Sequence, residues 1–209
     1  MTSRLALLLL LLVLPLAAHA ADPVAGVDFV EVPEGKPFAP TRGKVEVAEV
    51  FGYSCIHCFH FEPAVAAWKR KQPVDVKFVQ VPAAFGGYWT SYARAYFAAQ
   101  SLRLLDSTHD AVYKAVHVTG ALPVQNVSHA QIAAFYGTLG ADPKRFAKAM
   151  GSPAVDVQIE RARKFAVTAG VEGTPTMVVA GRYRVTARTL DDAWRTVDFL
   201  VARERAAAR

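Results

Sequence analysis

The chain has 209 residues, of which 53% are hydrophobic and 20% are charged, so it can bury a core and is not intrinsically disordered. Its 24 basic and 18 acidic side chains give a formal net charge of +6. These charges are scattered, and no basic stripe is interleaved with aromatic residues. We therefore expect one globular body that does not bind nucleic acid.

Residues 1–20 have the features of a cleavable signal peptide. Arg4 supplies a short positive region, residues 5–14 are all apolar, and Ala18 and Ala20 are the small residues that a signal peptidase reads. The apolar run is shorter than the roughly 17 to 25 residues that span a bilayer as a helix, which makes a membrane anchor the less favoured alternative. We expect an exported protein.

A proline-rich lead-in, residues 21–43, is predicted to hold at most one short strand. Residues 45–51 are apolar and rich in β-formers, so they predict a strand, and residues 52–54 mark a turn. Ser54 is the expected N-cap of a helix that begins at Cys55, and Pro63 is expected to kink that helix.

Both cysteines, Cys55 and Cys58, lie in one Cys-x-x-Cys motif. A disulfide that closes so short a loop restricts the unfolded chain little, so the pair is a poor structural cross-link. Two thiolates do not fill a four-thiolate zinc site, and a c-type haem needs histidine directly after the second cysteine, where this chain has Phe59. The motif therefore points to redox chemistry.

The helical position of the two cysteines predicts different environments for them. Cys58 shares one stripe with three apolar residues, Phe61, Val65 and Trp68. We expect Cys58 to face the core and Cys55 to lie exposed at the tip. Unpaired N–H groups and the helix dipole favour a thiolate in the first turn, and His57 adds to this, so the pKa of Cys55 is expected to fall by about one or two units from about 8.5.

The rest of the chain predicts a further strand, a group of helices, and then a hairpin and a last helix. Residues 74–81 are rich in β-formers, and residues 177–186 suit a hairpin that turns near Ala180 and Gly181. Helix starts are predicted at Ser107, at Ser128 with Gln131 as a capping box, at Asp142 with Pro143, and at Ser152 with Pro153. Apolar spacing over residues 190–200 predicts the last helix.

The strand, the turn, the Cys-x-x-Cys helix and a late Thr174-Pro175 before a strand together resemble the thioredoxin superfamily. With export, His57 and the Phe-Gly-Tyr-Ser lead into the motif, the chain most resembles DsbA-type periplasmic thiol:disulfide oxidoreductases. The resemblance implies an α/β, thioredoxin-like fold with an inserted all-helical domain. It divides the chain into residues 44–86 and 151–209 as the two thioredoxin-like parts and residues 87–150 as the insertion.

The resemblance also implies an activity and its partners. The protein would introduce disulfide bonds into folding exported polypeptides with free thiols, donating a Cys55–Cys58 disulfide through a mixed disulfide. It would work in the periplasm as a monomer, without a cofactor or metal, and a quinone-linked, DsbB-like membrane protein would reoxidise it.

Roles for individual residues follow from the same resemblance. Glu49 would be buried near the cysteines, with a raised pKa, and would exchange a proton with Cys58. Pro175 would be cis, which would leave the Thr174 backbone free to pair with an extended substrate. His57 would tune the thiolate.

Three alternatives stay open at this point. The chain has Ile56 and Thr174 where DsbA proteins commonly have proline and valine. This difference leaves open a reductase or an isomerase of the same fold. Against an isomerase, residues 21–54 are too short for the dimerisation domain that those proteins carry. A metal carrier would use His60 together with Cys55, His57 and Cys58. A cysteine hydrolase is the third, but no downstream histidine and asparagine context supports it.

Overall fold

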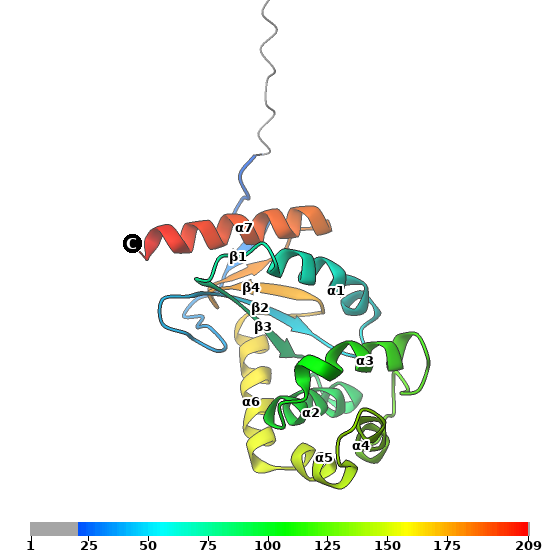
Figure 1. The fold of residues 1–209 in the computed structure, drawn as a ribbon. Coiled ribbons are helices and arrows are strands. Elements are labelled where there is room, and N and C mark those ends of the chain that lie inside the picture. Colours follow the sequence, from blue (N-terminus) through cyan, green and yellow to red (C-terminus); the bar gives the residue numbers. More distant parts are fainter. Residues whose placement is uncertain (1–20, 209) are drawn as a thin grey trace, which may run out of the picture.

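The computed structural model describes residues 21–208, so the predicted signal peptide lies outside the described residues. A five-stranded mixed sheet has the order β1-β5-β4-β2-β3 (Figure 1). Its strands are β1 (Phe29–Glu31), β2 (Val45–Phe51), β3 (Val76–Pro82), β4 (Thr176–Val179) and β5 (Tyr183–Val185). Among these five strands of the described residues, only β2 and β3 pair in parallel. The hairpin predicted over residues 177–186 is confirmed as β4 and β5.

The register around β2 positions the residues that matter later. Glu49 lies opposite Gln80 on β3 and opposite Met177 on β4. A parallel pair needs a crossover, which here contains the helix α1 (Ile56–Lys69). The carboxyl end of β2 therefore leads directly into α1, beside the residues that precede β4.

Two helices cover one face of the sheet, α1 and α7 (Leu190–Ala207) (Figure 1). Trp194 stacks between Phe61 and Trp68, with ring centroids 5.1 and 5.2 Å apart. The Trp68 indole N–H also donates to Asp198 at 2.7 Å. These contacts hold the two helices together and bury the predicted stripe of α1.

Five helices lie on the other side of the sheet, between β3 and β4 in the chain (Figure 1). They are α2 (Gly87–Ser101), α3 (Leu105–His117), α4 (His129–Thr138), α5 (Pro143–Met150) and α6 (Pro153–Thr168). Their apolar faces join the sheet in one continuous core. This α/β architecture with its helical insert confirms the predicted fold class. No helix within residues 21–208 is both long and apolar enough to cross a membrane.

Most predicted helix starts are confirmed, and two are wrong. Ser128 and Gln131 form the capping box, and Asp142 and Ser152 cap α5 and α6. Helix α3 begins at Leu105, not at Ser107, because the Ser107 hydroxyl donates to the Leu104 carbonyl and so does not cap. Helix α1 begins at Ile56, with Cys55 itself as the N-cap.

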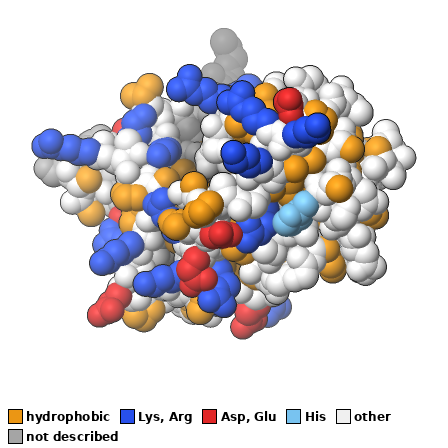
Figure 2. Space-filling view, turned by 90° about the horizontal axis from the view of Figure 1, so that it is seen from below, with side chains coloured by type: hydrophobic (Ala, Val, Ile, Leu, Met, Phe, Trp, Pro, Cys, Tyr) orange, Lys and Arg blue, Asp and Glu red, His pale blue; other side chains and the backbone are white. Residues whose placement is uncertain are grey.

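Charged side chains are distributed over the surface. Figure 2 views the molecule from below Figure 1 and shows lysine and arginine side chains in several separate groups, with acidic side chains between some of them. The face seen there agrees with the scattered charge of the sequence.

Candidate active site

The end of β2 and the first turn of α1 position the two cysteines. A Cβ atom at Gly52 would lie 2.3 Å from the Trp89 ring, so only glycine fits this turn. The Cys55 Sγ atom caps the helix by accepting from the Cys58 N–H at 3.4 Å. Cys58 is fully buried, as its place on the apolar stripe predicted.

Cys55 is less exposed than the sequence predicted, with 9% of its surface accessible. The prediction of an open tip was wrong because it considered α1 alone. The Thr174–Pro175 peptide bond is cis, and it lies against the cysteine, with the Thr174 carbonyl 3.3 Å from Sγ. Thr174 and Pro175 are thus brought together with Cys55.

The two thiols have opposite acidities. The pKa of Cys55 is lowered from 9.0 to about 5, first by a hydrogen bond from the Cys58 side chain, then by Thr174 and by the backbone N–H groups of Cys58 and His57, against an opposing effect of burial. Burial first, and then the neighbouring Cys55, raise the pKa of Cys58 far above its ordinary value. The pKa of Cys55 is lower than the sequence predicted, because the N–H groups at the helix terminus are only one of the causes that lower it.

Thr174 offers a test of this hydrogen bonding. Replacing Thr174 by Val, which has the same shape, removes a hydroxyl that stabilises the thiolate, while the carbonyl contact to Sγ stays. We expect the pKa of Cys55 to rise in Thr174→Val, but by less than in Cys58→Ala, because the Cys58 side chain makes the larger contribution. The ultraviolet absorbance of the thiolate, at about 240 nm, measures this pKa during a pH titration. An unchanged midpoint would show that the Thr174 hydroxyl has no such effect.

Glu49 lies in the middle of β2 and is fully buried. Burial is the main cause that raises its pKa from 4.5 to about 8, and the charge of Glu62 is the second. Its Oε2 atom lies 3.5 Å from the Gln80 side-chain nitrogen, and its Oε1 atom has no hydrogen-bond partner within the described chain. The predicted burial and the direction of the pKa shift are confirmed, and proton exchange with Cys58 stays a proposal.

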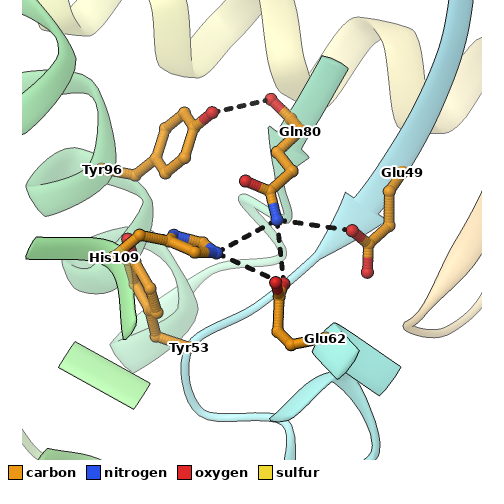
Figure 3. A network of polar contacts seen from close by, with 6 residues as sticks. All are labelled: Glu49, Tyr53, Glu62, Gln80, Tyr96 and His109. Carbon is orange, nitrogen blue, oxygen red and sulfur yellow. Dashed lines mark hydrogen bonds and ion pairs between the residues drawn. The ribbon is translucent and has the colours of Figure 1, made fainter. Parts of the chain in front are cut away.

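Sequence reasoning missed a polar network that reaches Glu49 through Gln80 (Figure 3). It consists of Tyr53, Glu62, Gln80, Tyr96 and His109. Gln80 lies opposite Glu49 because β2 and β3 pair in parallel, a register that sequence reasoning did not predict. No sequence pattern places His109, because it comes from α3, on the other side of the sheet.

One histidine within the motif and one just after it lie on the surface beside a groove. His57 and His60 are exposed and line a groove of about 410 Å³ with Pro175 and Leu190. Within residues 21–208, no three His, Cys, Asp or Glu side chains converge as metal ligands. The arrangement needed for a metal carrier is therefore not formed by Cys55, His57, Cys58 and His60.

Comparisons with known proteins agree with this geometry. Residues 80–198 match the family described as DSBA-like thioredoxin domain. The thiol:disulfide interchange protein DsbA of Pseudomonas aeruginosa is 36% identical over 197 residues, which covers 93% of this chain and 92% of the relative. That of Azotobacter vinelandii is 36% identical over 190 residues, covering 90% and 87%. The crystal structure of oxidoreductase DsbA from Xylella fastidiosa is 47% identical with a TM-score of 0.85, covering 88% of this chain and 98% of that one.

Proposed function

Since this chain belongs to the DsbA family of thiol:disulfide oxidoreductases, which introduce disulfide bonds, we propose that its Cys55–Cys58 pair is the disulfide donated to substrate thiols. The observation that carries this assignment is the opposite acidity of the two sulfurs. A thiolate stabilised at Cys55 favours the reduced form of the protein, which makes the disulfide form a strong oxidant.

The proposed reaction runs in two exchanges. A substrate thiolate attacks the Cys55 sulfur, the Cys55–Cys58 bond breaks, and Cys58 leaves with the electron pair. A second substrate thiolate then attacks the substrate sulfur of the mixed disulfide and releases Cys55 as a thiolate. The substrate loses two electrons, and the protein gains them.

The buried leaving group needs a proton. Because the pKa of Cys58 lies far above its ordinary value, its thiolate is unstable and takes up a proton when it forms. Glu49 is the proposed donor, since its pKa of about 8 keeps it mostly protonated at neutral pH and its charge affects Cys58.

The substrate would lie along the groove beside the cysteines. The Thr174 backbone precedes β4 and is proposed to pair with an extended segment, with Pro175 beneath it. His57 supplies a backbone N–H to the thiolate, and its ring lines the groove together with Leu190. Main-chain pairing reads no side chains, and a groove lined by both polar and apolar residues suits many unrelated sequences.

We further propose where the protein works and how it is reoxidised. The predicted signal peptide supports export to the periplasm, where folding polypeptides with free thiols are the substrates. Since each reaction leaves the protein reduced, repeated turnover needs an oxidant, for which a DsbB-like, quinone-linked membrane protein is proposed. A monomer with no cofactor suffices for the two exchanges.

The test mixes the oxidised protein with one equivalent of a reduced two-cysteine peptide. We expect the peptide to be oxidised stoichiometrically by the wild-type protein and not at all by Cys55→Ser, which lacks the disulfide. Equilibration with glutathione then measures whether the pair donates or withdraws disulfides. Peptide that stays reduced, or undiminished oxidation by Cys55→Ser, would refute the proposal.

A further inference from the structure

The network around Glu49 connects the buried carboxyl group to the surface of the molecule. Glu49 has no exposed surface, whereas the side chains of Glu62 and His109 are 19% and 13% exposed. Gln80 lies between Glu49 and the pair formed by Glu62 and His109 (Figure 3). Tyr53 contacts the other nitrogen of the His109 ring. Five elements contribute to the network, so its geometry is set by the docking of α1, α2 and α3 against β2 and β3.

The side-chain nitrogen of Gln80 has more acceptors within reach than it has hydrogens. It lies 2.9 Å from Glu62 Oε1, 3.1 Å from His109 Nε2 and 3.5 Å from Glu49 Oε2. An amide nitrogen carries two hydrogens, so it serves only two of these three acceptors at a time. The His109 Nε2 atom is also 3.3 Å from Glu62 Oε1, and its Nδ1 atom is 2.8 Å from the Tyr53 hydroxyl.

One consistent arrangement suits a neutral Glu49. Gln80 donates to Glu62 and to His109 Nε2, and His109 donates through Nδ1 to the Tyr53 oxygen. Glu49 receives no hydrogen from Gln80, so it keeps its own proton. Its Oε1 atom, which has no partner within residues 21–208, is the oxygen left to carry that proton.

A second arrangement suits an ionised Glu49. Gln80 then donates to Glu49 and Glu62, because a buried carboxylate needs a donor more than an imidazole does. His109 now carries its proton on Nε2 and donates to Glu62, and the Tyr53 hydroxyl donates to Nδ1. Every donor has an acceptor in this arrangement, and the imidazole carries one proton in each. In the neutral arrangement, the protons of Glu49 and of the Tyr53 hydroxyl have no acceptor among the described side chains.

We propose that Gln80 and His109 form a hydrogen-bond switch in which the tautomer of His109 follows the charge on Glu49. Both are positioning residues, because neither contacts the sulfur atoms. The switch supplies a hydrogen-bond donor to Glu49 when it is ionised and withdraws that donor when it is neutral, so one carboxyl group serves as an acid and as a base.

The use of this switch in disulfide exchange rests on the proposed function. When Cys58 leaves as a thiolate, Glu49 gives it a proton, and the network changes to the ionised arrangement. During reoxidation Cys58 gives a proton back to the ionised Glu49, which returns the network to the neutral arrangement before the next cycle. Glu62, Gln80 and His109 line a cavity of about 240 Å³ on the path to the surface.

Other titratable groups surround the network. The same cavity is lined by the charged residues Lys69 of α1 and Asp106 and Asp110 of α3. The His109 ring also contacts Tyr53, Tyr96 and Tyr113. Burial raises the pKa of each of these tyrosines, so they stay protonated over the range in which Glu49 titrates.

Nuclear magnetic resonance of the reduced protein, labelled with ¹⁵N in histidine, tests the switch between about pH 7 and pH 10, where an ordinary imidazole is neutral. We expect the His109 proton to move from Nδ1 to Nε2 as pH rises. Its midpoint should coincide with loss of the Glu49 carboxylic acid band in the infrared spectrum. His109→Gln identifies the His109 signals.

His117 on the same helix is the internal control. Its Nε2 atom lies 2.8 Å from the Tyr53 carbonyl, which only accepts, so its tautomer should stay constant. Glu49→Gln, which does not ionise, and Gln80→Met, which keeps the length but lacks the N–H groups, should each abolish the change at His109. Unchanged His117 signals show that these variants fold.

Two results would overturn the switch. One is a His109 tautomer that stays constant while Glu49 titrates in the wild-type protein, which needs no variant to fold. The other is a tautomer change that persists in Glu49→Gln or Gln80→Met. Peptide oxidation is measured separately, so a failure of the switch is distinguishable from a failure of the proposed function.

Discussion

Alkylation with iodoacetamide at pH 6 should modify Cys55 and leave Cys58 as a free thiol. With a pKa of about 5, Cys55 is mostly thiolate at this pH, whereas the pKa of Cys58 is far above its ordinary value and the residue is fully buried. The thiolate is the reactive form. Mass spectrometry of the digested protein identifies the labelled residue, and the rate measured against pH gives its midpoint.

The rate advantage of Cys55 is smaller than its thiolate fraction alone predicts. Compared with a thiol of pKa 9, the thiolate fraction at pH 6 is about a thousandfold higher. A thiolate of low pKa is intrinsically less nucleophilic, by about 40- to 100-fold over this interval. The net expectation is a rate about ten to twenty times that of an ordinary thiol.

Variants of Cys58 test the cause of this reactivity. The hydrogen bond from Cys58 is the largest contribution that lowers the pKa of Cys55. Cys58→Ala should therefore move the midpoint of alkylation to higher pH, and Cys58→Ser, which keeps a donor, should move it less. Preferential labelling of Cys58, or a wild-type midpoint near 9, would contradict the proposed roles of the two sulfurs.

Replacing Glu49 by Gln should stabilise the oxidised protein at alkaline pH by less than the ~5 kcal/mol that a pKa of about 8 implies, because that pKa is raised in part by the charge of Cys55, which a disulfide removes. The folded-state pKa of about 8 lies above the ordinary 4.5, so the contribution of Glu49 to stability is complete below pH 4.5 and is lost as pH rises to about 8. Glutamine has the same shape and does not ionise. The two proteins should therefore be similar in stability at pH 4 and differ most above pH 8.

Urea unfolding at several pH values measures this difference. The oxidised protein is used because the Cys55 thiolate stabilises the reduced protein with the opposite dependence: its folded-state pKa of about 5 lies below 9.0, so that contribution is lost as pH falls. A difference between wild type and Glu49→Gln that does not grow between pH 4 and pH 8 would contradict a buried, ionising Glu49.

Glu46 provides a matched control on the same strand. It is 2% exposed, but its carboxylate accepts the backbone N–H groups of Phe38 and Ala39 at 2.5 and 2.6 Å. Glu46→Gln should lower the stability at neutral pH, because a charged acceptor that these donors require is lost. If the substitution lowers the stability at Glu46 and raises it at Glu49, the hydrogen-bond partners of each carboxylate, and not burial alone, determine how the substitution changes the stability.

The sequence predicted the features that depend on neighbouring residues. The two-cysteine motif, the buried stripe of α1 and the caps at Ser128, Asp142 and Ser152 are each encoded within a few residues. The fold class was also predicted, through the resemblance that those local features carry. Even there, the N-cap at Cys55 was missed, because serine at position 54 is the more common type of cap.

Only the tertiary structure decided how much of Cys55 is accessible and which groups surround Glu49. The Thr174 carbonyl reaches Cys55 from 119 residues away, and His109 reaches Gln80 from another helix. Such contacts depend on strand register and on how helices dock, which the whole core determines together. Periodicity shows which face of an element is buried, whereas the partner on that face is chosen by packing between segments distant in the chain.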